Sequence, residues 1–341
     1  MRLTGEDDLI PVGVLTGFLG SGKTTVLRRI LEAEAFGDSA VLINEFGEVG
    51  LDHILVGEIA PDVVLLNSGC LCCTLRGELR DALSSLLSSR TRGEIPPFKR
   101  VIVETTGIAQ PSLILSTIFA DPQIRHHYAV GDVVATVDAM HALMQSKEQE
   151  VWMEQVTAAD DLLLTKTDMV GEAHEVHRLL DAINPTARRL SSDSAEVLRL
   201  FSRHSKAEDA EQRRRRHLFG FAAASPARHE HEDHIHASVA TIRVSADEPV
   251  DWEAFGVWLS MLLHAHGKNI MRVKGLLYLE ESEGPVVIQG VQHVIHPPEH
   301  LPNWGELPKR TDLVFILRQI NPELVRRSFE TFVLGSRRFV P

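Results

Sequence analysis

The sequence is poor in cysteine: it holds three thiols in 341 residues, and all of them lie within residues 70–73. Three thiols cannot all pair, and cysteines this close in sequence form disulfides only with strain. A disulfide framework is therefore not expected. Metal binding, redox chemistry and chance remain as explanations of the cluster.

The sequence also lacks long apolar runs and an excess of basic residues. No segment offers about 18 uninterrupted apolar residues, the length of a membrane-spanning helix, and residues 1–20 lack the basic start, apolar run and cleavage site of a secretory signal. Asp and Glu number 47 against 35 Lys and Arg, a net charge of -12, which disfavours broad attraction to nucleic acid or anionic lipid. We expect a cytoplasmic protein that binds neither nucleic acid nor membrane.

Buried strands are predicted by six apolar runs in the first two hundred residues. The runs are continuous rather than alternating, as expected when helices cover both faces of a parallel sheet. Helical spacing appears between them, for example at Leu27, Ile30 and Leu31. The alternation predicts a doubly wound α/β fold with a mainly parallel sheet. The runs are residues 12–16, 40–43, 63–66, 101–104, 133–137 and 162–165.

A change of character divides the chain, which is long enough for two domains. We assign an α/β domain to residues 1–202, a charged linker to 203–236, and a smaller α+β domain to 237–341. In residues 237–341 predicted strands follow one another with only short turns between them, which predicts antiparallel pairing. The expected strands of this part are 238–244, 275–280, 286–291 and 312–317, and its expected helices are 251–267 and 321–333. Trp252, Phe255, Leu259 and Leu262 have helical spacing and are predicted core residues.

A phosphate-binding loop is indicated by GFLGSGKTT, residues 17–25, which matches G-x-x-x-x-G-K-[ST] between a predicted strand and helix. In such a loop, backbone N–H groups surround phosphate oxygens, the lysine reaches the β and γ phosphates, and the next hydroxyl ligates Mg²⁺. We therefore assign Lys23 as catalytic and Thr24 as the Mg²⁺ ligand. The expected nucleotide contacts are Gly17, Gly20, Ser21, Gly22, Lys23, Thr24 and Thr25.

A second phosphate-side element is expected at ETTG, residues 104–107. Glu104 ends a predicted strand, where it would hold Mg²⁺ through water or position the attacking water. We assign it as catalytic, and Gly107 as a nucleotide contact. Taken alone, Glu104 is also consistent with an acidic residue that merely ends a strand.

Guanine recognition is indicated by TKTD, residues 165–168. Asp168 can accept hydrogen bonds from guanine N1–H and N2–H₂, which adenine does not present, while the stem of Lys166 lies over the ring. Thr165 stands where the usual motif has asparagine, so one amide contact is missing or supplied otherwise. An ordinary exposed loop is the alternative interpretation of this short pattern.

The cysteine cluster predicts a metal site, because three cysteines fall as C-x-C-C only about once in 20,000 random arrangements. Soft thiolates suit Zn²⁺, Co²⁺ and Cu⁺. Cys72 and Cys73 point opposite ways on an extended chain, so two cysteines with an outside ligand are as plausible as all three with Cys70. Residues 43–52 could supply a carboxylate, and they lie where GTPases keep a nucleotide-sensing switch. Redox sensing is the competing use.

Five segments in this order resemble the CobW-type metallochaperone GTPases, relatives of the nickel-delivery GTPases of urease and hydrogenase maturation. They are GFLGSGKTT, NEFGEVGLD, NSGCLCCT, ETTGIAQP and TKTD, and the resemblance covers residues 11 to about 185, then continues more loosely. It implies a GTPase that binds Zn²⁺ or Co²⁺ and delivers it to a client protein. It also implies Cys72 as a metal ligand and Glu48 as the likeliest carboxylate ligand.

A second cluster of metal-binding side chains lies in RHEHEDHIH, residues 228–236, with His229, His231, His234 and His236. Imidazoles and the acids between them can hold Zn²⁺, Co²⁺ or Ni²⁺ loosely. We interpret the segment as a collecting or buffering site rather than the transfer site. A solvated linker is the alternative.

The predicted mechanism couples two sites. GTP and Mg²⁺ would order residues 43–52 and assemble the thiolate site, and slow intrinsic hydrolysis would release the metal. Two rivals are a small-molecule kinase with structural thiols and a nucleotide-regulated metal buffer or sensor. The sequence leaves open the metal, the client and whether the chain forms a homo-oligomer.

Overall fold

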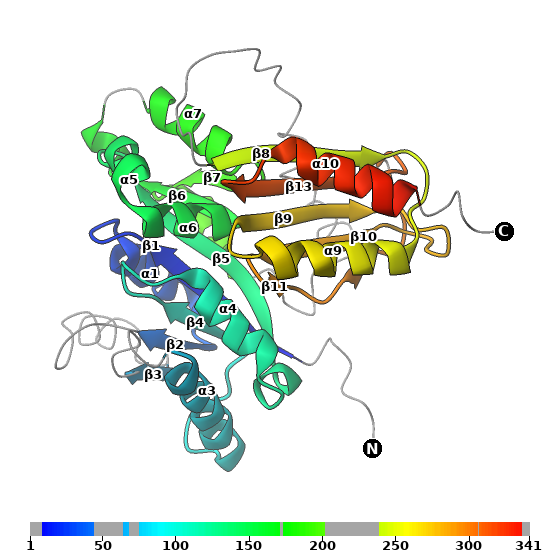
Figure 1. Ribbon diagram of the computed structural model, residues 1–341. Helices are drawn as coiled ribbons and strands as arrows, with labels where there is room; N and C mark the ends of the chain where they lie inside the picture. The colour runs from blue at the N-terminus through cyan, green and yellow to red at the C-terminus, as the bar shows by residue number, and fades with distance from the viewer. Residues whose placement is uncertain are drawn as a thin grey trace. The chain divides into compact units, whose positions relative to one another are not determined.

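The computed structural model describes residues 9–43, 64–67, 75–170, 173–201, 239–305 and 307–335. The chain divides into two compact units (Figure 1). One comprises Met1–Val176 with Arg188–Glu208, and the other comprises His177–Ala187 with Asp209–Pro341. Each unit has a sheet of its own.

The first unit is built on a seven-stranded sheet in the order β3-β2-β4-β1-β5-β6-β7. Every neighbouring pair is parallel. All six predicted apolar runs are strands of this sheet, so the predicted doubly wound class is confirmed. The strands are β1 (Ile10–Gly17), β2 (Ser39–Ile43), β3 (Val64–Asn67), β4 (Arg100–Glu104), β5 (Tyr128–Asp138), β6 (Asp161–Thr165) and β7 (Arg188–Ser191).

Helices cover both faces of this sheet. The connections from β1 to β2 and from β2 to β3 run one way along the sheet, and those from β3 onward run the other way, so right-handed crossovers place α1 on the face opposite α3, α4 and α6. On the second of these faces, α4 packs against both α3 and α6. No helix of the described ranges combines the length and apolarity needed to cross a membrane. The helices of this unit are α1 (Lys23–Leu31), α3 (Leu75–Arg92), α4 (Pro111–Ala120), α5 (Ala142–Glu148) and α6 (Glu150–Ala158), and most of α7 (His174–Ile183) belongs to the second unit.

The strand β7 was not predicted. Its sequence is RRLS, and no residue of it is fully buried, so it lacks the apolar run by which the other strands were found. Arg188 Nε donates to Asp161 Oδ1 at 2.7 Å, which ties this polar edge strand to β6.

The second unit is a six-stranded antiparallel sheet in the order β11-β10-β9-β13-β8, with β12 paired to β10. The predicted antiparallel α+β class of this part is therefore confirmed. β9 begins at Ile270, earlier than predicted. The elements are β8 (Val239–Ala246), α9 (Trp252–His266), β9 (Ile270–Leu277), β10 (Val286–Val291), β11 (Val294–Ile295), β12 (Glu299–His300), β13 (Thr311–Arg318), α10 (Pro322–Phe329) and a π-helical turn (Glu330–Leu334).

The core of the second unit is centred on Trp258 of α9. Its ring lies 5.9 Å from that of Phe315 on β13 and 5.2 Å from that of Phe329 on α10, and its Nε1 donates to Ser328 Oγ at 2.9 Å. Phe255 and Leu259 are buried as predicted, and Leu262 is partly buried. The prediction for Trp252 was wrong: it is the first residue of α9 and is 44% exposed.

Candidate nucleotide-binding site

The carboxyl ends of four parallel strands bring the predicted site residues to one edge of the sheet. The register pairs Leu15 of β1 with Glu104 of β4, and Gly17 of β1 with Thr136 of β5. It also pairs Asp138 of β5 with Thr165 of β6. In doubly wound sheets this edge is where ligands bind.

The predicted phosphate loop joins β1 to α1. Gly17, Gly20 and Gly22 have φ of 141°, 69° and 89°, values that favour glycine over residues with a Cβ. Gly22 is the N-cap of α1. The loop therefore places the first turn of α1 at the sheet edge, where the backbone N–H groups of that turn can bind anions.

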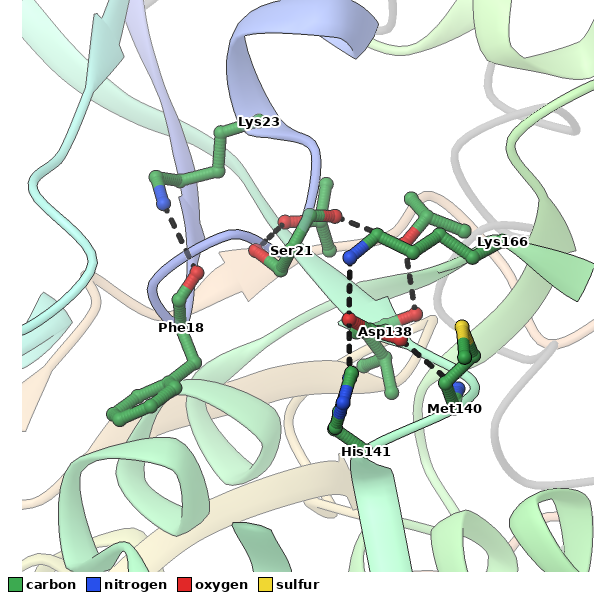
Figure 2. A network of polar contacts seen from close by, with 10 residues as sticks. Phe18, Ser21, Lys23, Asp138, Met140, His141 and Lys166 are labelled. Carbon is green, nitrogen blue, oxygen red and sulfur yellow. Dashed lines mark hydrogen bonds and ion pairs between the residues drawn. The ribbon is translucent and has the colours of Figure 1, made fainter. Parts of the chain in front are cut away.

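Lys23 folds back over this loop. Its Nζ donates to the carbonyl oxygens of Gly17 at 3.0 Å and Phe18 at 3.1 Å, and Figure 2 shows the Phe18 contact. The ammonium group is thus held above the loop rather than in bulk solvent. It lies where a phosphate-binding lysine is needed.

Ser21 anchors the loop to two strands. Its Oγ lies 2.6 Å from Thr136 Oγ1 on β5, and its carbonyl oxygen accepts from Thr165 Oγ1 on β6 at 2.9 Å. All three residues are buried. The segment that begins at Thr165 and the predicted phosphate loop are therefore joined through the Thr165 hydroxyl, at the position where the usual motif has asparagine.

A pocket of about 350 Å³ opens at this edge. Thr24 Oγ1 donates to Glu104 Oε1 at 2.9 Å across it, and Glu104 is 4% exposed. A hydroxyl beside a carboxylate is the kind of hard oxygen set that suits Mg²⁺, so these residues fit the predicted ion. The pocket is lined by Leu19, Gly20, Gly22, Lys23, Thr24, Thr25, Glu104 and Gly107.

Gly107 packs directly on the backbone of the phosphate loop. A Cβ at this position would lie 2.6 Å from Leu19 N and 2.7 Å from Leu19 Cα. Such a contact cannot be relieved by turning a side chain, because the neighbouring atoms belong to the backbone. The requirement for glycine at residue 107 therefore follows from its close approach to the loop.

Lys166 is oriented by a cluster of polar side chains that sequence reasoning missed. Its backbone has φ 55°, and its Nζ donates to Asp138 Oδ2 at 2.6 Å. The same oxygen lies 2.9 Å from His141 Nδ1, while Asp138 Oδ1 accepts from Met140 N at 2.9 Å. Figure 2 shows both side chains converging on the Asp138 carboxylate. The available signal was that Asp138 directly follows the apolar run 133–137, just as Glu104 ends its own run.

The charge on Asp138 is stabilised by these contacts. Burial raises the pKa of its carboxyl group, but the hydrogen bonds from Lys166, His141 and the Met140 N–H together outweigh burial and hold that pKa below its ordinary value. Asp138 is therefore ionised at neutral pH. It fixes the Lys166 stem beside the sheet edge.

Asp168 lies in the short 3-10 helix Thr167–Met169 that follows β6. Its side chain is exposed, so it is available to a ligand rather than used within the fold. The structure thus places Thr165, Lys166 and Asp168 on one segment next to the phosphate loop.

The predicted transition-metal ligands fall outside the described residues. These are Cys70, Cys72, Cys73 and Glu48 of the first cluster and His229, His231, His234 and His236 of the second. Within the part of the chain that the structure describes, no group of three or more His, Cys, Asp or Glu residues could hold a metal ion.

We predict that Asp138→Asn lowers the free energy of unfolding by about 1–2 kcal/mol at neutral pH, because charge-assisted hydrogen bonds to Lys166 and His141 are lost. Since the folded-state pKa of Asp138 is lowered, its contribution is present above about pH 4 and is lost as the pH falls through that lowered pKa. Urea unfolding of both proteins across this range should show the difference narrowing in acid.

The matched control for this prediction is Asp81→Asn. Asp81 also pairs with a basic side chain, that of Arg80, at 2.8 Å, but the Asp81 side chain is 69% exposed, and exposed pairs contribute little. An equal loss of stability in both variants would contradict the role assigned to Asp138.

Comparison with known families gives two matches that follow one another along the chain. The family profile described as "CobW/HypB/UreG, nucleotide-binding domain" matches residues 11–191. The profile "Cobalamin synthesis protein cobW C-terminal domain" matches residues 239–333.

Comparison with individual proteins agrees with these matches. The chain is 34% identical over 322 residues to the zinc chaperone YjiA of Escherichia coli (strain K12), covering 94% of this chain and 98% of that protein. It is 33% identical over 209 residues to the zinc-regulated GTPase metalloprotein activator 1 of Schizosaccharomyces pombe, covering 57% and 49%. The crystal structure of Zn(II)-bound YjiA GTPase from E. coli superposes with a TM-score of 0.70 at 29% identity, covering 95% of this chain and 99% of that one. The chain therefore belongs to the CobW/HypB/UreG family and carries the CobW C-terminal domain.

Proposed function

We propose that this protein is a GTPase that couples GTP binding and hydrolysis to the binding of Zn²⁺ or Co²⁺ and its delivery to a client metalloprotein. The observation that carries the proposal is the pocket in which Lys23, the Thr24–Glu104 pair and Gly107 meet, with the Lys166 segment attached to the same loop through Thr165. The relatives named zinc chaperone and zinc-regulated GTPase metalloprotein activator support the metal cargo and the client.

In this proposal the phosphates bind to the loop of residues 17–25. The N–H groups of residues 17–25 surround them, and the Lys23 ammonium leaves the Gly17 and Phe18 carbonyls for the β and γ phosphates. Thr24 would hold Mg²⁺, which would neutralise developing charge on the phosphates. Glu104, hydrogen-bonded to Thr24, would hold that ion through water or position the attacking water.

The base is read by the segment that follows β6. Asp168 accepts from guanine N1–H and N2–H₂, and the Lys166 stem lies over the ring with its ammonium group fixed by Asp138. Thr165, which stands where the usual motif has asparagine, joins this segment to the phosphate loop through its hydroxyl group.

The metal is cargo in this mechanism rather than a resident cofactor. We assign its binding to two or three of Cys70, Cys72 and Cys73, with Glu48 as a carboxylate ligand. The histidines of residues 229–236, in the proposed linker 203–236 between domains 1–202 and 237–341, collect metal loosely. Nucleotide state and metal bias the same segment, residues 43–52, so each must alter the affinity for the other.

This coupling is tested by measuring Zn²⁺ affinity in a competition titration with a chromophoric chelator, once with a non-hydrolysable GTP analogue and once with GDP, both with Mg²⁺. We expect affinity to be about 5- to 100-fold higher with the GTP analogue, the usual range of a coupling free energy. GTP hydrolysis is measured in parallel, and the titration is repeated with Co²⁺ and Ni²⁺.

Two outcomes would overturn the proposal. Equal Zn²⁺ affinity in both nucleotide states would remove the coupling and leave a buffer or sensor. Phosphate transfer to a small molecule, together with indifference to Zn²⁺, would identify a kinase.

A further inference from the structure

A buried glutamine on α6 contacts the loop that follows Glu104. The side-chain amide of Gln155 donates from Nε2 to the carbonyl oxygens of Gly107 at 3.2 Å and Ala109 at 3.0 Å. Gln155 is 1% exposed. Because both contacts are to acceptors, the NH₂ end of the amide must face the loop.

The other end of this amide is not used. Gln155 Oε1 is buried and makes no hydrogen bond with the described residues. A buried acceptor without a donor destabilises the fold, and a methionine would fill the same volume without that penalty. Packing alone therefore does not account for glutamine here, whereas the two bonds to the loop do.

The loop that Gln155 holds presents backbone donors at the pocket. Gly107 lines the pocket and lies against Leu19. Among the described residues, the backbone N–H groups of Gly107 and Ile108 donate no hydrogen bond, although the Ala109 N–H donates to Thr106 O. In a planar trans peptide the C=O and N–H point opposite ways, so holding the Gly107 carbonyl toward α6 directs the Ile108 N–H away from α6.

We propose that Gln155 is a positioning residue that fixes the loop 105–109 so that its N–H groups meet the terminal phosphate of the nucleotide. This inference rests on the proposed GTPase function. Gln155 acts through the loop, since it contacts the Gly107 and Ala109 carbonyls rather than the pocket. It therefore supports the γ-phosphate and the transition state, and GDP binding does not depend on it.

The test is Gln155→Met, which keeps the side-chain length and removes both donors. We expect kcat for GTP hydrolysis to fall about 10- to 100-fold, as the loss of two neutral buried hydrogen bonds predicts. GDP affinity, measured with a fluorescent GDP derivative, should stay within about 2-fold. A merely structural role would not separate these two quantities.

Gln145→Met is the matched control. Gln145 on α5 is also buried and also has an Oε1 without a hydrogen bond to the described residues, but no hydrogen bond joins its side chain to the loop 105–109. It should leave kcat within about 2-fold. If Gln155→Met fails to fold, Gln155→Asn replaces it, because an amide one methylene shorter cannot reach both carbonyls and should lower kcat with GDP affinity retained.

The outcomes separate this inference from the proposed function. The wild type must hydrolyse GTP in the same assay; if it does not, the GTPase proposal fails. If the wild type hydrolyses GTP and a folded Gln155 variant matches it in kcat, the positioning role is wrong. Equal losses of kcat and GDP affinity would likewise overturn it, since they would indicate general damage to the site.

Discussion

Lys23→Ala should lower kcat/KM for GTP hydrolysis about 10²- to 10³-fold. The Lys23 ammonium group lies over the phosphate loop, bonded to the Gly17 and Phe18 carbonyls, and in the proposed mechanism it meets the β and γ phosphates. Removing one preorganised donor to developing negative charge typically costs this much in rate. The measurement is phosphate release at saturating and limiting GTP, which separates kcat from KM.

Lys99→Ala is the control for the loss of a positive charge. Lys99 also makes a polar contact, 2.9 Å from Asp38, but its side chain is 79% exposed and lines no part of the pocket. The Lys99→Ala variant should hydrolyse GTP at the wild-type rate. A Lys23→Ala protein that is folded, as judged by circular dichroism, and still hydrolyses GTP at the wild-type rate would show that this loop does not perform the reaction.

Cys72→Ala should lower Zn²⁺ affinity by at least about 100-fold, because a thiolate is a main ligand of a soft or borderline cation and its loss removes several kcal/mol of binding free energy. GDP affinity should stay within about 2-fold, since Lys23, Thr24 and Glu104 are untouched. Zn²⁺ affinity is measured by competition with a chelator, and Co²⁺ absorption reports thiolate coordination directly.

Parallel variants identify the other ligands. Cys70→Ala, Cys73→Ala and Glu48→Gln each remove one candidate, and those that leave affinity unchanged are not ligands. His234→Ala is the control, because the collecting site is proposed to bind metal only loosely. Wild-type Zn²⁺ affinity in Cys72→Ala, or a larger loss in His234→Ala, would contradict the assignment of the cysteine cluster as the transfer site.

The strands were predictable where burial on both faces makes the sequence continuously apolar. The run 162–165 gave β6 in this way, whereas RRLS of β7 lies at the sheet edge, where polar residues are tolerated. Spacing correctly predicted Phe255 and Leu259 as core, but it also predicted Trp252, which is the first residue of the helix and is 44% exposed. Trp258, three residues beyond Phe255, fills the core instead.

The phosphate loop was predictable because its chemistry is local: glycines, a lysine and a hydroxyl follow one another within nine residues. The roles of Asp138 and Gln155 could not be predicted in this way. Each acts on a partner far away in sequence, Asp138 on Lys166 and Gln155 on Gly107, and neither belongs to a repeated pattern. Only the register of β5 with β6 and the packing of α6 bring these pairs together.

In the proposed mechanism, the bond from Thr165 to Ser21 couples recognition of the base to binding of the phosphates. A base that fits poorly against the Lys166 segment would displace the Thr165 hydroxyl and, through it, the loop proposed to bind the phosphates. Selectivity among nucleotides would then be expressed in turnover as well as in affinity, because an incorrect base would misalign the reacting phosphate. In that mechanism, one hydroxyl group couples base selectivity to the rate of hydrolysis.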